Sequence, residues 1–291
     1  MKAKKSGDKK RRHKSWLWLT LCAAVLTGLL LDGRYRLVTT EYQVASPQLP
    51  AAFDGFRIVQ LSDLHLRQYG RDNARILKQV RELSPDIIVL TGDFLDKFGC
   101  QAEGEQALEL ESFFHELVRL APCYYVSGNH EWASGELPAL ESLLEQQGIR
   151  YLKNEYLTLE RSGESIVLAG VEDPNGMADM IKPPELVARL RQEYPEGFAI
   201  LLGHRNYWLE KYPQLDVDLI FSGHAHGGII RLPFAGGIFG TNGELFPQYD
   251  KGIFNEGGYD LVISGGLGDS LPLVRLFNNP EIVSVVLKCE K

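Results

Sequence analysis

Five short apolar runs in this sequence each lead directly into a turn that carries aspartate, asparagine or histidine. In the clearest of them, Leu219-Ile220-Phe221 is followed by Ser222-Gly223 and then by His224 and His226. Short apolar runs bounded by glycine are typical of buried β-strands. Because amphipathic helical segments separate the runs, the chain is predicted to fold as an α/β protein. Ligands of such proteins gather at the carboxyl ends of the strands.

The other four runs repeat this design with different polar residues. These predicted strands are 56–61, 87–90, 123–126 and 198–202. Apolar residues recur at helical spacing between them, most clearly from Glu105 to Leu120, and the glycine-rich segment 227–247 is a predicted loop over the site. The polar residues at the four strand ends are Asp63, His65, Asp93, Asn129, His130 and His204.

The chemistry of this set is that of metal ligands. Every donor is an oxygen or nitrogen atom and none is a thiolate, which suits Mn, Fe, Zn, Co or Ni. One polar strand end usually caps the backbone, but five in succession favour a ligand set, and eight donors are too many for one tetrahedral zinc. We therefore expect two divalent ions that share a carboxylate, with Asp93 as the bridge. His130, next to the neutral donor Asn129, is the expected proton donor to a leaving group.

Several neighbouring residues extend this interpretation. We expect His224 and His226 to serve different ions, on the assumption that alternate side chains of an extended segment point in opposite directions. Arg67 and Arg205 are weaker candidates for substrate contact, for which solvated charge or packing is an equal alternative. Glu131 is also a weak candidate for lining the substrate entrance, with the same alternatives of solvated charge or packing.

The N-terminal segment has the pattern of a membrane anchor. Residues 1–14 contain eight lysines or arginines, and the 16 residues from Trp16 to Leu31 carry no charge. About 20 apolar residues are usual for a membrane span, but tilt accommodates a shorter one. A cleaved signal peptide is disfavoured because no Ala-X-Ala site follows, and a buried helix of a soluble protein is a second alternative.

The positive-inside rule keeps the basic tail in the cytoplasm and places the catalytic domain outside it, on a single-pass protein of the cell membrane. The predicted division is a basic cytoplasmic tail (1–14), a transmembrane or signal-anchor segment (15–32), a linker with an edge strand (33–55) and a catalytic domain (56–291).

Charge and cysteine content exclude some classes of function. From Gly33 onward, 23 bases stand against 36 acids, a formal charge of -13. Such a body is a poor partner for nucleic acid, whose affinity for proteins comes mostly from neutralised phosphates. The four cysteines show no paired spacing, so they indicate neither a disulfide framework nor a zinc knuckle.

The polar turns resemble, in order and spacing, the five motif blocks of the calcineurin-like metallophosphoesterases. The blocks are Asp63-Leu64-His65, Gly92-Asp93, Gly128-Asn129-His130-Glu131, Gly203-His204 and Gly223-His224-Ala225-His226. The segment 264–282 looks like the ending of a bacterial membrane-associated phosphodiesterase branch. Two departures stand out: Arg205-Asn206-Tyr207 follows His204 where relatives commonly carry Asn-Pro-Asp, and Ala225 replaces the usual threonine.

The resemblance implies a four-layer sandwich of two central mixed β-sheets flanked by helices, with a dinuclear centre at the strand ends. It also implies a residue assignment, in which a hydroxide that bridges the metals is the nucleophile and His130 is the general acid. Asp93 lies between the ions, one of which is held by Asp63, His65 and His226 and the other by Asn129, His204 and His224.

These observations lead to one functional hypothesis. The chain is expected to be a membrane-anchored, metal-dependent phosphodiesterase that acts outside the cytoplasm on an envelope or lipid-linked phosphate. A phosphomonoesterase of the same fold is the first alternative, and the acidic body argues against a nuclease. A non-catalytic metal-binding interaction module is less favoured, because it would be expected to have lost ligands.

Overall fold

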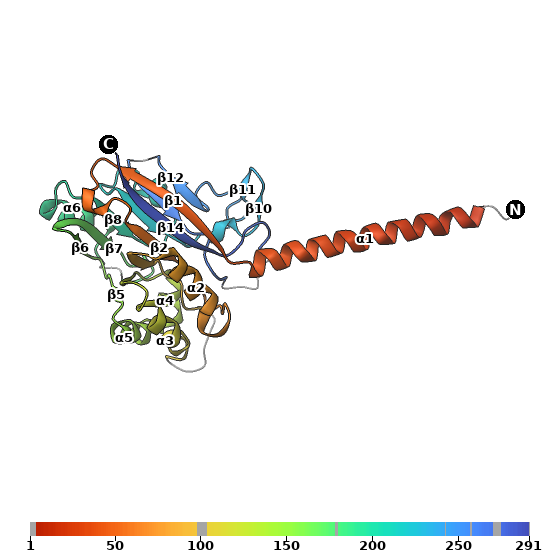
Figure 1. The fold of residues 1–291 in the computed structure, drawn as a ribbon, viewed down its shortest axis with the longest axis horizontal. Helices are drawn as coiled ribbons and strands as arrows, with labels where there is room; N and C mark the ends of the chain where they lie inside the picture. The colour runs from red at the N-terminus through yellow and green to blue at the C-terminus, as the bar shows by residue number, and fades with distance from the viewer. Residues whose placement is uncertain are drawn as a thin grey trace.

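Two six-stranded sheets stack face to face in the computed structural model (Figure 1), which describes residues 4–97, 104–177, 180–241, 243–256, 258–269 and 275–290. Across the first sheet the strands are β1 (Val38–Ser46), β14 (Glu281–Cys289), β2 (Arg57–Leu61), β3 (Ile87–Leu90), β4 (Cys123–Tyr125) and β5 (Arg150–Tyr151). Across the second they are β12 (Gly252–Phe254), β13 (Asp260–Ile263), β9 (Leu219–Ser222), β8 (Ala199–Leu202), β7 (Glu164–Gly170) and β6 (Glu155–Arg161). Both sheets are mixed, since β14 is antiparallel to β2 and β6 is antiparallel to β7.

Helices cover the outer face of each sheet, which gives the domain four layers. The first sheet packs against α2 (Ala74–Leu83), α3 (Glu105–Leu117) and α5 (Leu137–Gln147). The second packs against α6 (Pro183–Glu193) and α7 (Trp208–Lys211). The short elements are α4 (Asn129–Ser134), η1 (Ala51–Phe53), η2 (Arg71–Asn73), η3 (His226–Gly228) and the ribbon of β10 (Arg231–Leu232) and β11 (Gly236–Gly237). The predicted four-layer sandwich is confirmed.

The central strands bury both of their faces, which explains why they appear in the sequence as continuous apolar runs. In β8, Ile200 and Leu202 contribute to the core between the sheets. Ala199 and Leu201 point the other way and pack with the helices of the outer layer. Side chains of a strand alternate between its two faces, so a run with both faces buried has few polar positions, with the buried Gln60 of β2 as an exception. Most polar side chains therefore come where each strand ends.

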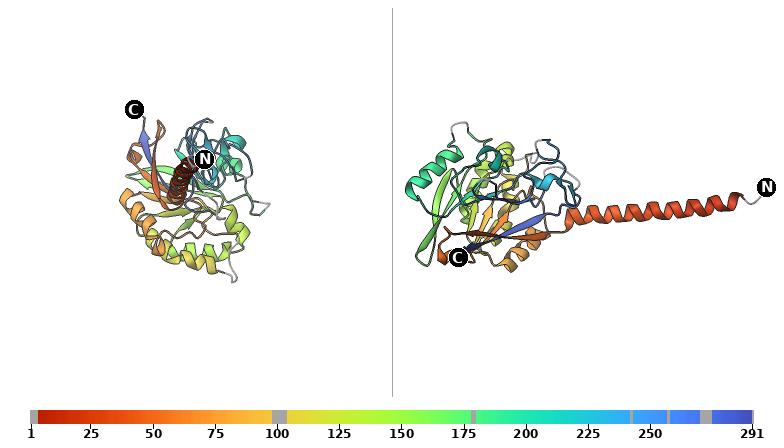
Figure 2. Two further views of the ribbon diagram at one scale, coloured as in Figure 1. Left: turned by 90° about the vertical axis from the view of Figure 1, so that its right-hand side faces the viewer. Right: turned by 90° about the horizontal axis from the view of Figure 1, so that it is seen from above.

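Helix α1 (Lys4–Tyr35) projects from one side of the domain as a straight rod (Figures 1 and 2). Its segment Trp16–Tyr35 is long and apolar enough to cross a membrane, with a mean hydropathy of 1.6. Only 6% of this segment is buried, so it is not a core helix of the folded domain.

The carboxyl end of α1 is fixed to the domain, and only two residues separate it from β1. Arg67 donates to the carbonyl oxygen of Arg34, and Arg75 donates to that of Tyr35 at 3.0 Å. These bonds satisfy carbonyl groups that have no partner within a helix end. Gly33 packs so closely on the backbone of Arg275 that a Cβ atom there would overlap the Arg275 carbonyl oxygen. The predicted linker region 33–55 thus contains the end of α1, β1 and η1.

Candidate metal centre

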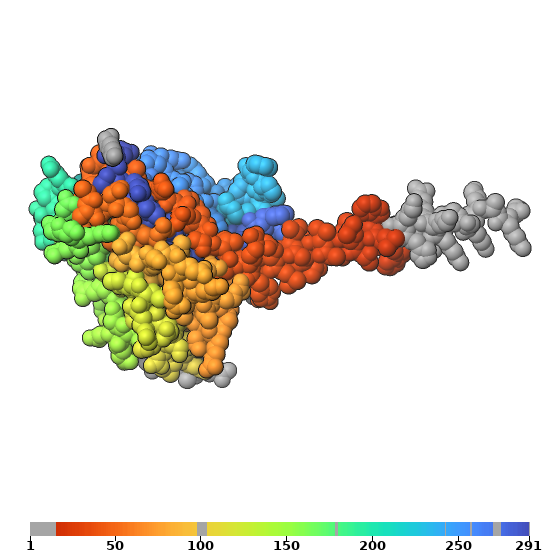
Figure 3. Space-filling view, viewed as in Figure 1, coloured from red at the N-terminus to blue at the C-terminus, as the bar shows by residue number. Residues whose placement is uncertain are grey.

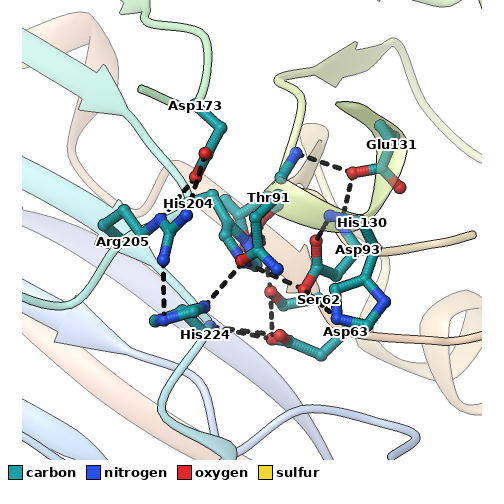
Figure 4. A network of polar contacts seen from close by, with 12 residues as sticks. Ser62, Asp63, Thr91, Asp93, His130, Glu131, Asp173, His204, Arg205 and His224 are labelled. Atoms are coloured by element: carbon teal, nitrogen blue, oxygen red, sulfur yellow. Dashed lines mark hydrogen bonds and ion pairs between the residues drawn. The ribbon is translucent and has the colours of Figure 1, made fainter. Parts of the chain in front are cut away.

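The carboxyl ends of five strands meet at one edge of the sandwich and bring the predicted ligands together; Figure 4 labels Asp63, Asp93, His130, His204 and His224 among them. Strands β2, β3 and β4 run parallel in the first sheet, and β8 and β9 run parallel in the second. The turns that follow them therefore lie on the same side. Of the eight predicted residues, Asn129 is half-buried and the others are buried, namely Asp63, His65, Asp93, His130, His204, His224 and His226.

Asp63, His65 and His226 form a first group, in which one ligand atom from each lies within 4.8 Å of the others. The His226 Nε2 atom is 3.6 Å from the Asp63 carboxylate, and its Nδ1 atom is 3.1 Å from the Gly268 carbonyl oxygen. A proton that Nδ1 donates to this carbonyl leaves the Nε2 lone pair facing the carboxylate. An outer hydrogen bond of this kind orients metal-binding histidines.

Asp93, His204 and His224 form a second group. The His204 Nε2 atom lies 3.2 Å from each of three atoms: a carboxylate oxygen of Asp93, Oδ1 of Asn129 and Nδ1 of His224. Its other ring nitrogen lies 2.8 Å from the Thr91 carbonyl oxygen, to which it donates. Oxygen and nitrogen atoms of four side chains thus converge on one place, a donor set that suits a cation.

Asp93 connects the two groups through a single carboxylate oxygen. Its Oδ2 atom lies 3.2 Å from His204 Nε2, 3.9 Å from His65 Nε2 and 3.8 Å from His130 Nε2. The other oxygen, Oδ1, accepts a hydrogen bond from the His130 backbone amide at 2.8 Å. One oxygen is therefore held by the backbone, and the other faces ligands of both groups.

His224 and His226 lie in different groups, as their predicted assignment to different ions requires, but the reason given for that assignment is wrong. Residues two apart on an extended strand point to the same face, not to opposite faces. The chain leaves β9 before His224 and turns sharply, with φ of 70° at His224 and 47° at His226. This turn directs one ring to each group.

Strained backbone is common among the ligands. A left-handed φ is uncommon for residues other than glycine and costs free energy unless the surroundings impose it. Here Gly128 and Gly223 allow the close approach, because a Cβ atom at either would overlap the carboxylate of Asp93 or Asp63. The ligands with a left-handed φ are Asp63, His65, Asp93, His224 and His226.

The residues present fit divalent cations. His65 is fully buried, yet neither of its ring nitrogens has a hydrogen-bond partner among the described residues. Burial lowers the pKa of His65 well below its usual value, and burial with the neighbouring His204 does the same to His224, so both are neutral, the form in which an imidazole can bind a metal. Although burial opposes it, Asp93 raises the pKa of His204 to about 10. His204 therefore carries a proton among these donor atoms, at a place that suits a cation.

His130 lies beside both groups and forms a third cluster with His65 and Asp93. Its Nδ1 atom accepts a hydrogen bond from the backbone amide of Lys97 at 3.1 Å. It also lies 3.6 Å from the Asp96 carboxylate. A neutral imidazole whose Nδ1 is an acceptor carries its proton on Nε2, and this atom faces the Asp93 carboxylate. The ring is thus held in an orientation that presents a proton to the site.

Arg205 points into the site rather than into solvent (Figure 4). Its Nη1 atom is 3.0 Å from His224 Nε2, and it forms a two-bond ion pair with Asp173 at 2.6 and 3.0 Å. Arg205 and His204 line a pocket that also has aromatic and apolar walls, including Trp208. Asp173 was not singled out in the sequence, although it follows the apolar run of β7 in the same way that the ligands follow their strands.

Arg67 has a different environment. It donates to backbone oxygen atoms of Leu267 and Arg34, and it lies 3.9 Å from the Asp269 carboxylate. Asp269 in turn lies 3.5 Å from Nδ1 of His226 and is paired with the buried Arg275 at 2.9 Å. Arg67 therefore stands behind the ligands in contact with the base of α1. Asp269 and Arg275 support His226, and the glycine-rich turn after β13 was the sequence signal for them.

Glu131 has a structural role that could not be predicted from its position next to the predicted ligands in the sequence. Its carboxylate is fully buried and accepts hydrogen bonds from the backbone amides of Gly128, Asp93, Phe94 and Leu95 at 2.6 to 3.1 Å. Burial, followed by the charge of Asp93, raises its pKa to about 7. Glu131 thus holds the β3 and β4 turns against each other and does not line the substrate entrance.

Replacing Glu131 with alanine is expected to lower the free energy of unfolding by about 3 kcal/mol or more, because four buried amides lose their acceptor. Denaturant unfolding of the purified full chain measures this change. The matched control is Glu145→Ala on the exposed side of α5, which is expected to change stability by less than about 0.5 kcal/mol. Equal stability of the two variants would contradict the role given to Glu131.

Comparisons with known proteins identify the family to which the chain belongs. The family model for calcineurin-like phosphoesterases matches residues 56–228, more than half of the chain. The uncharacterized metallophosphoesterase YkuE of Bacillus subtilis (strain 168) is 31% identical over 265 residues, covering 87% of this chain and 86% of that protein. A transmembrane protein with metallophosphoesterase domain from Danio rerio is 28% identical over 291 residues, covering 92% of this chain and 62% of that protein.

A third relative has a named activity. The UDP-2,3-diacylglucosamine pyrophosphatase LpxG of Chlamydia muridarum (strain MoPn / Nigg) is 28% identical over 328 residues, covering 94% of this chain and 93% of that protein. The family binds two divalent metal ions, and the described residues contain three clusters of aspartate and histidine that could hold metal ions. The chain therefore belongs to the calcineurin-like phosphoesterase family and is a metal-dependent phosphoester hydrolase.

Proposed function

We propose that this protein is a membrane-anchored phosphodiesterase that hydrolyses an envelope or lipid-linked phosphate ester outside the cytoplasm. The observation that carries the reaction is the single Asp93 oxygen that faces two groups of ligands. Two divalent ions at such a site lower the pKa of a water held between them and stabilise charge on phosphate oxygens. The donor set suits Mn, Fe, Zn, Co or Ni. Asp63, His65 and His226 would hold one ion, Asn129, His204 and His224 the other, and Asp93 both.

Two residues of the chain would act on the substrate directly. His130 presents its Nε2 proton beside the ligand groups, where it would protonate the leaving alkoxide. Arg205 has a guanidinium group that two hydrogen bonds to Asp173 hold in the wall of the pocket, where it would bind a phosphate oxygen. This chain has Arg205-Asn206-Tyr207 where relatives commonly carry Asn-Pro-Asp. Arg205 would therefore make the substrate contacts at this position.

The location rests on the N-terminal segment. Helix α1 contains a membrane-length apolar segment, and basic residues precede it. The name of the Danio rerio relative also suggests membrane association. The positive-inside rule favours a cytoplasmic N-terminus and an external catalytic domain on a single-pass protein. The substrate class is supported by LpxG, whose name denotes action on a diacylated sugar nucleotide.

Comparing hydrolysis of two chromogenic esters tests the reaction. With Mn²⁺ and the full chain in detergent, we expect kcat/KM for bis(p-nitrophenyl) phosphate to exceed that for p-nitrophenyl phosphate by about tenfold or more, about 1.4 kcal/mol in transition-state binding. The Arg205→Lys variant is expected to lower both values, because an ammonium cannot form the paired bonds of a guanidinium. A preference for the monoester would support the alternative phosphomonoesterase, and no turnover of either would support a binding module. Incubation with envelope lipid extracts would then identify the phosphate species that disappears.

A further inference from the structure

The metal centre and the base of the membrane anchor lie on the same side of the domain. Strand β1 is parallel to β14, and β14 is antiparallel to β2. The first residue of β1, which follows α1, therefore lies at the edge where β2 ends and Asp63 begins the site. Because only two residues join α1 to β1, the domain has no long tether on which to turn away from a membrane that α1 enters.

One buried residue connects the anchor to the ligands. The side chain of Arg275 is 1% exposed. Its Nη2 atom lies 3.4 Å from Nδ1 of His226, while its backbone carbonyl packs against Gly33 of α1. A single layer of protein thus separates the last turns of α1 from a predicted metal ligand. A membrane around α1 would lie close to the centre.

The surface beside the anchor is unusually apolar. Nine large hydrophobic side chains are exposed among the described residues from Val38 onward, and six of them lie in segments 232–246 and 277. Phe234 is fully exposed, and Phe246 is 57% exposed. We call these six residues the apolar loop surface: Leu232, Phe234, Phe239, Leu245, Phe246 and Phe277.

The apolar loop surface is continuous with both the anchor and the centre. The chain enters this loop directly from His226, and Asn278 holds the entrance by donating to the carbonyl oxygens of His226 and Ile229. Ile230 pairs with Leu276, the neighbour of the residue on which α1 packs. Figure 3 shows the β10–β11 region next to the base of α1, and both views of Figure 2 agree with this placement.

Its chemistry fits the interface of a bilayer. Segment 229–246 has only two charged residues, Arg231 and Glu244, and Arg231 is paired with Asp250 at 2.8 Å. Exposed phenylalanine and leucine side chains with little charge around them bind at the boundary between headgroups and acyl chains. A protein partner would also bury such a patch, but the anchor places a membrane there without any further component.

We propose that the apolar loop surface is immersed in the membrane interface next to α1, so that the metal centre operates at the bilayer surface. This inference rests on the anchor in the proposed function and gives it a substrate class. A phosphate ester on a membrane lipid would present its phosphate at headgroup level, next to the turn that holds His226. The substrate would then reach the site from the membrane and not from bulk solution.

Photo-crosslinking of the full chain in nanodiscs tests this placement. The photo-reactive residue p-benzoylphenylalanine would replace Phe234 or Phe246 in separate variants, in nanodiscs of phosphatidylethanolamine and phosphatidylglycerol. The matched control is the same replacement of Leu108, which is 67% exposed on α3, on another side of the domain (Figure 1). We expect at least about tenfold more phospholipid adduct, measured by mass spectrometry, at positions 234 and 246 than at 108.

Equal lipid adducts at all three positions, or adducts at position 234 to protein instead of lipid, would overturn the proposal. A denaturant-unfolding transition equal to that of the unaltered chain shows that a variant is folded, and position 246 provides a second variant if position 234 is not tolerated. Crosslinking does not depend on turnover. Lipid adducts without diester hydrolysis would therefore refute the proposed reaction alone, and hydrolysis without lipid adducts would refute the membrane placement alone.

Discussion

Replacing Asp93 with alanine is expected to lower the hydrolysis of bis(p-nitrophenyl) phosphate by three orders of magnitude or more, about 4 kcal/mol in transition-state stabilisation. The same change is expected to reduce bound metal from two ions per chain to one or fewer. The reason is that the Oδ2 atom of Asp93 faces His204, His65 and His130 within 3.9 Å. Its loss removes the shared ligand and the negative charge from both groups. Steady-state kinetics and elemental analysis of the purified full chain measure the two effects.

Two further variants separate loss of metal from loss of folding. Asp93→Asn keeps an oxygen for the His130 backbone amide, a bond of 2.8 Å, but removes the anion. It should therefore fold normally and still lose activity. Asp72→Asn is the matched control, because Asp72 is an exposed aspartate with a similar left-handed φ of 50°. If the Asp93 variants bound two ions and kept their activity, the dinuclear centre would have to be built without this residue.

The sequence predicted the fold because its strands bury both faces. A run such as Ile87–Leu90 has no solvent-facing position, so the first polar residues mark the strand end. Parallel strands then bring these ends to one edge, and the residues needed for the site could be identified before their geometry was known. The order of strands within the sheets was not accessible in the same way. Pairing of β1 with β14 joins residues that are more than 240 positions apart.

The supporting residues were harder to predict because their function depends on partners far along the chain. Glu131 is next to the ligands in sequence, but three of its four hydrogen bonds go to the turn after β3. Asp269 and Arg275 meet His226 only after the chain has completed the second sheet. A charge near a motif is equally compatible with substrate binding, solvent exposure and burial. Only the fold distinguishes these possibilities.

The contact between the anchor and the domain could not be predicted from sequence periodicity either. The uncharged apolar run ends at Leu31, and a linker was predicted from residue 33 onward. In the structure α1 continues to Tyr35 because Arg36 pairs with Asp32 one turn earlier, at 2.6 Å, and because Arg67 and Arg75 bind its last carbonyl groups. These stabilising groups come from another part of the chain, so no local pattern predicts them.

Replacing His130 with alanine is expected to lower kcat by about 10²–10⁴-fold, the usual contribution of a general acid. Both metal ions should remain bound. The size of the loss should depend on the leaving group. A nitrophenolate is stable without a proton, so its diester should lose least, whereas an ester with an alkyl leaving group should lose most. Kinetics with a series of phosphodiesters of graded leaving-group basicity measure this dependence.

His115→Ala provides the matched control, because His115 is exposed on α3 and its Nδ1 atom lies 3.3 Å from Gln147, away from the centre. Its removal should leave kcat unchanged for every ester. His130 forms a cluster with His65 and Asp93, so its position allows either proton donation or metal binding. The dependence on the leaving group distinguishes these two roles. A His130→Ala variant that loses metal, with an equal decrease for all leaving groups, would identify His130 as a ligand. Retained metal and a loss that grows with leaving-group basicity would identify it as the acid.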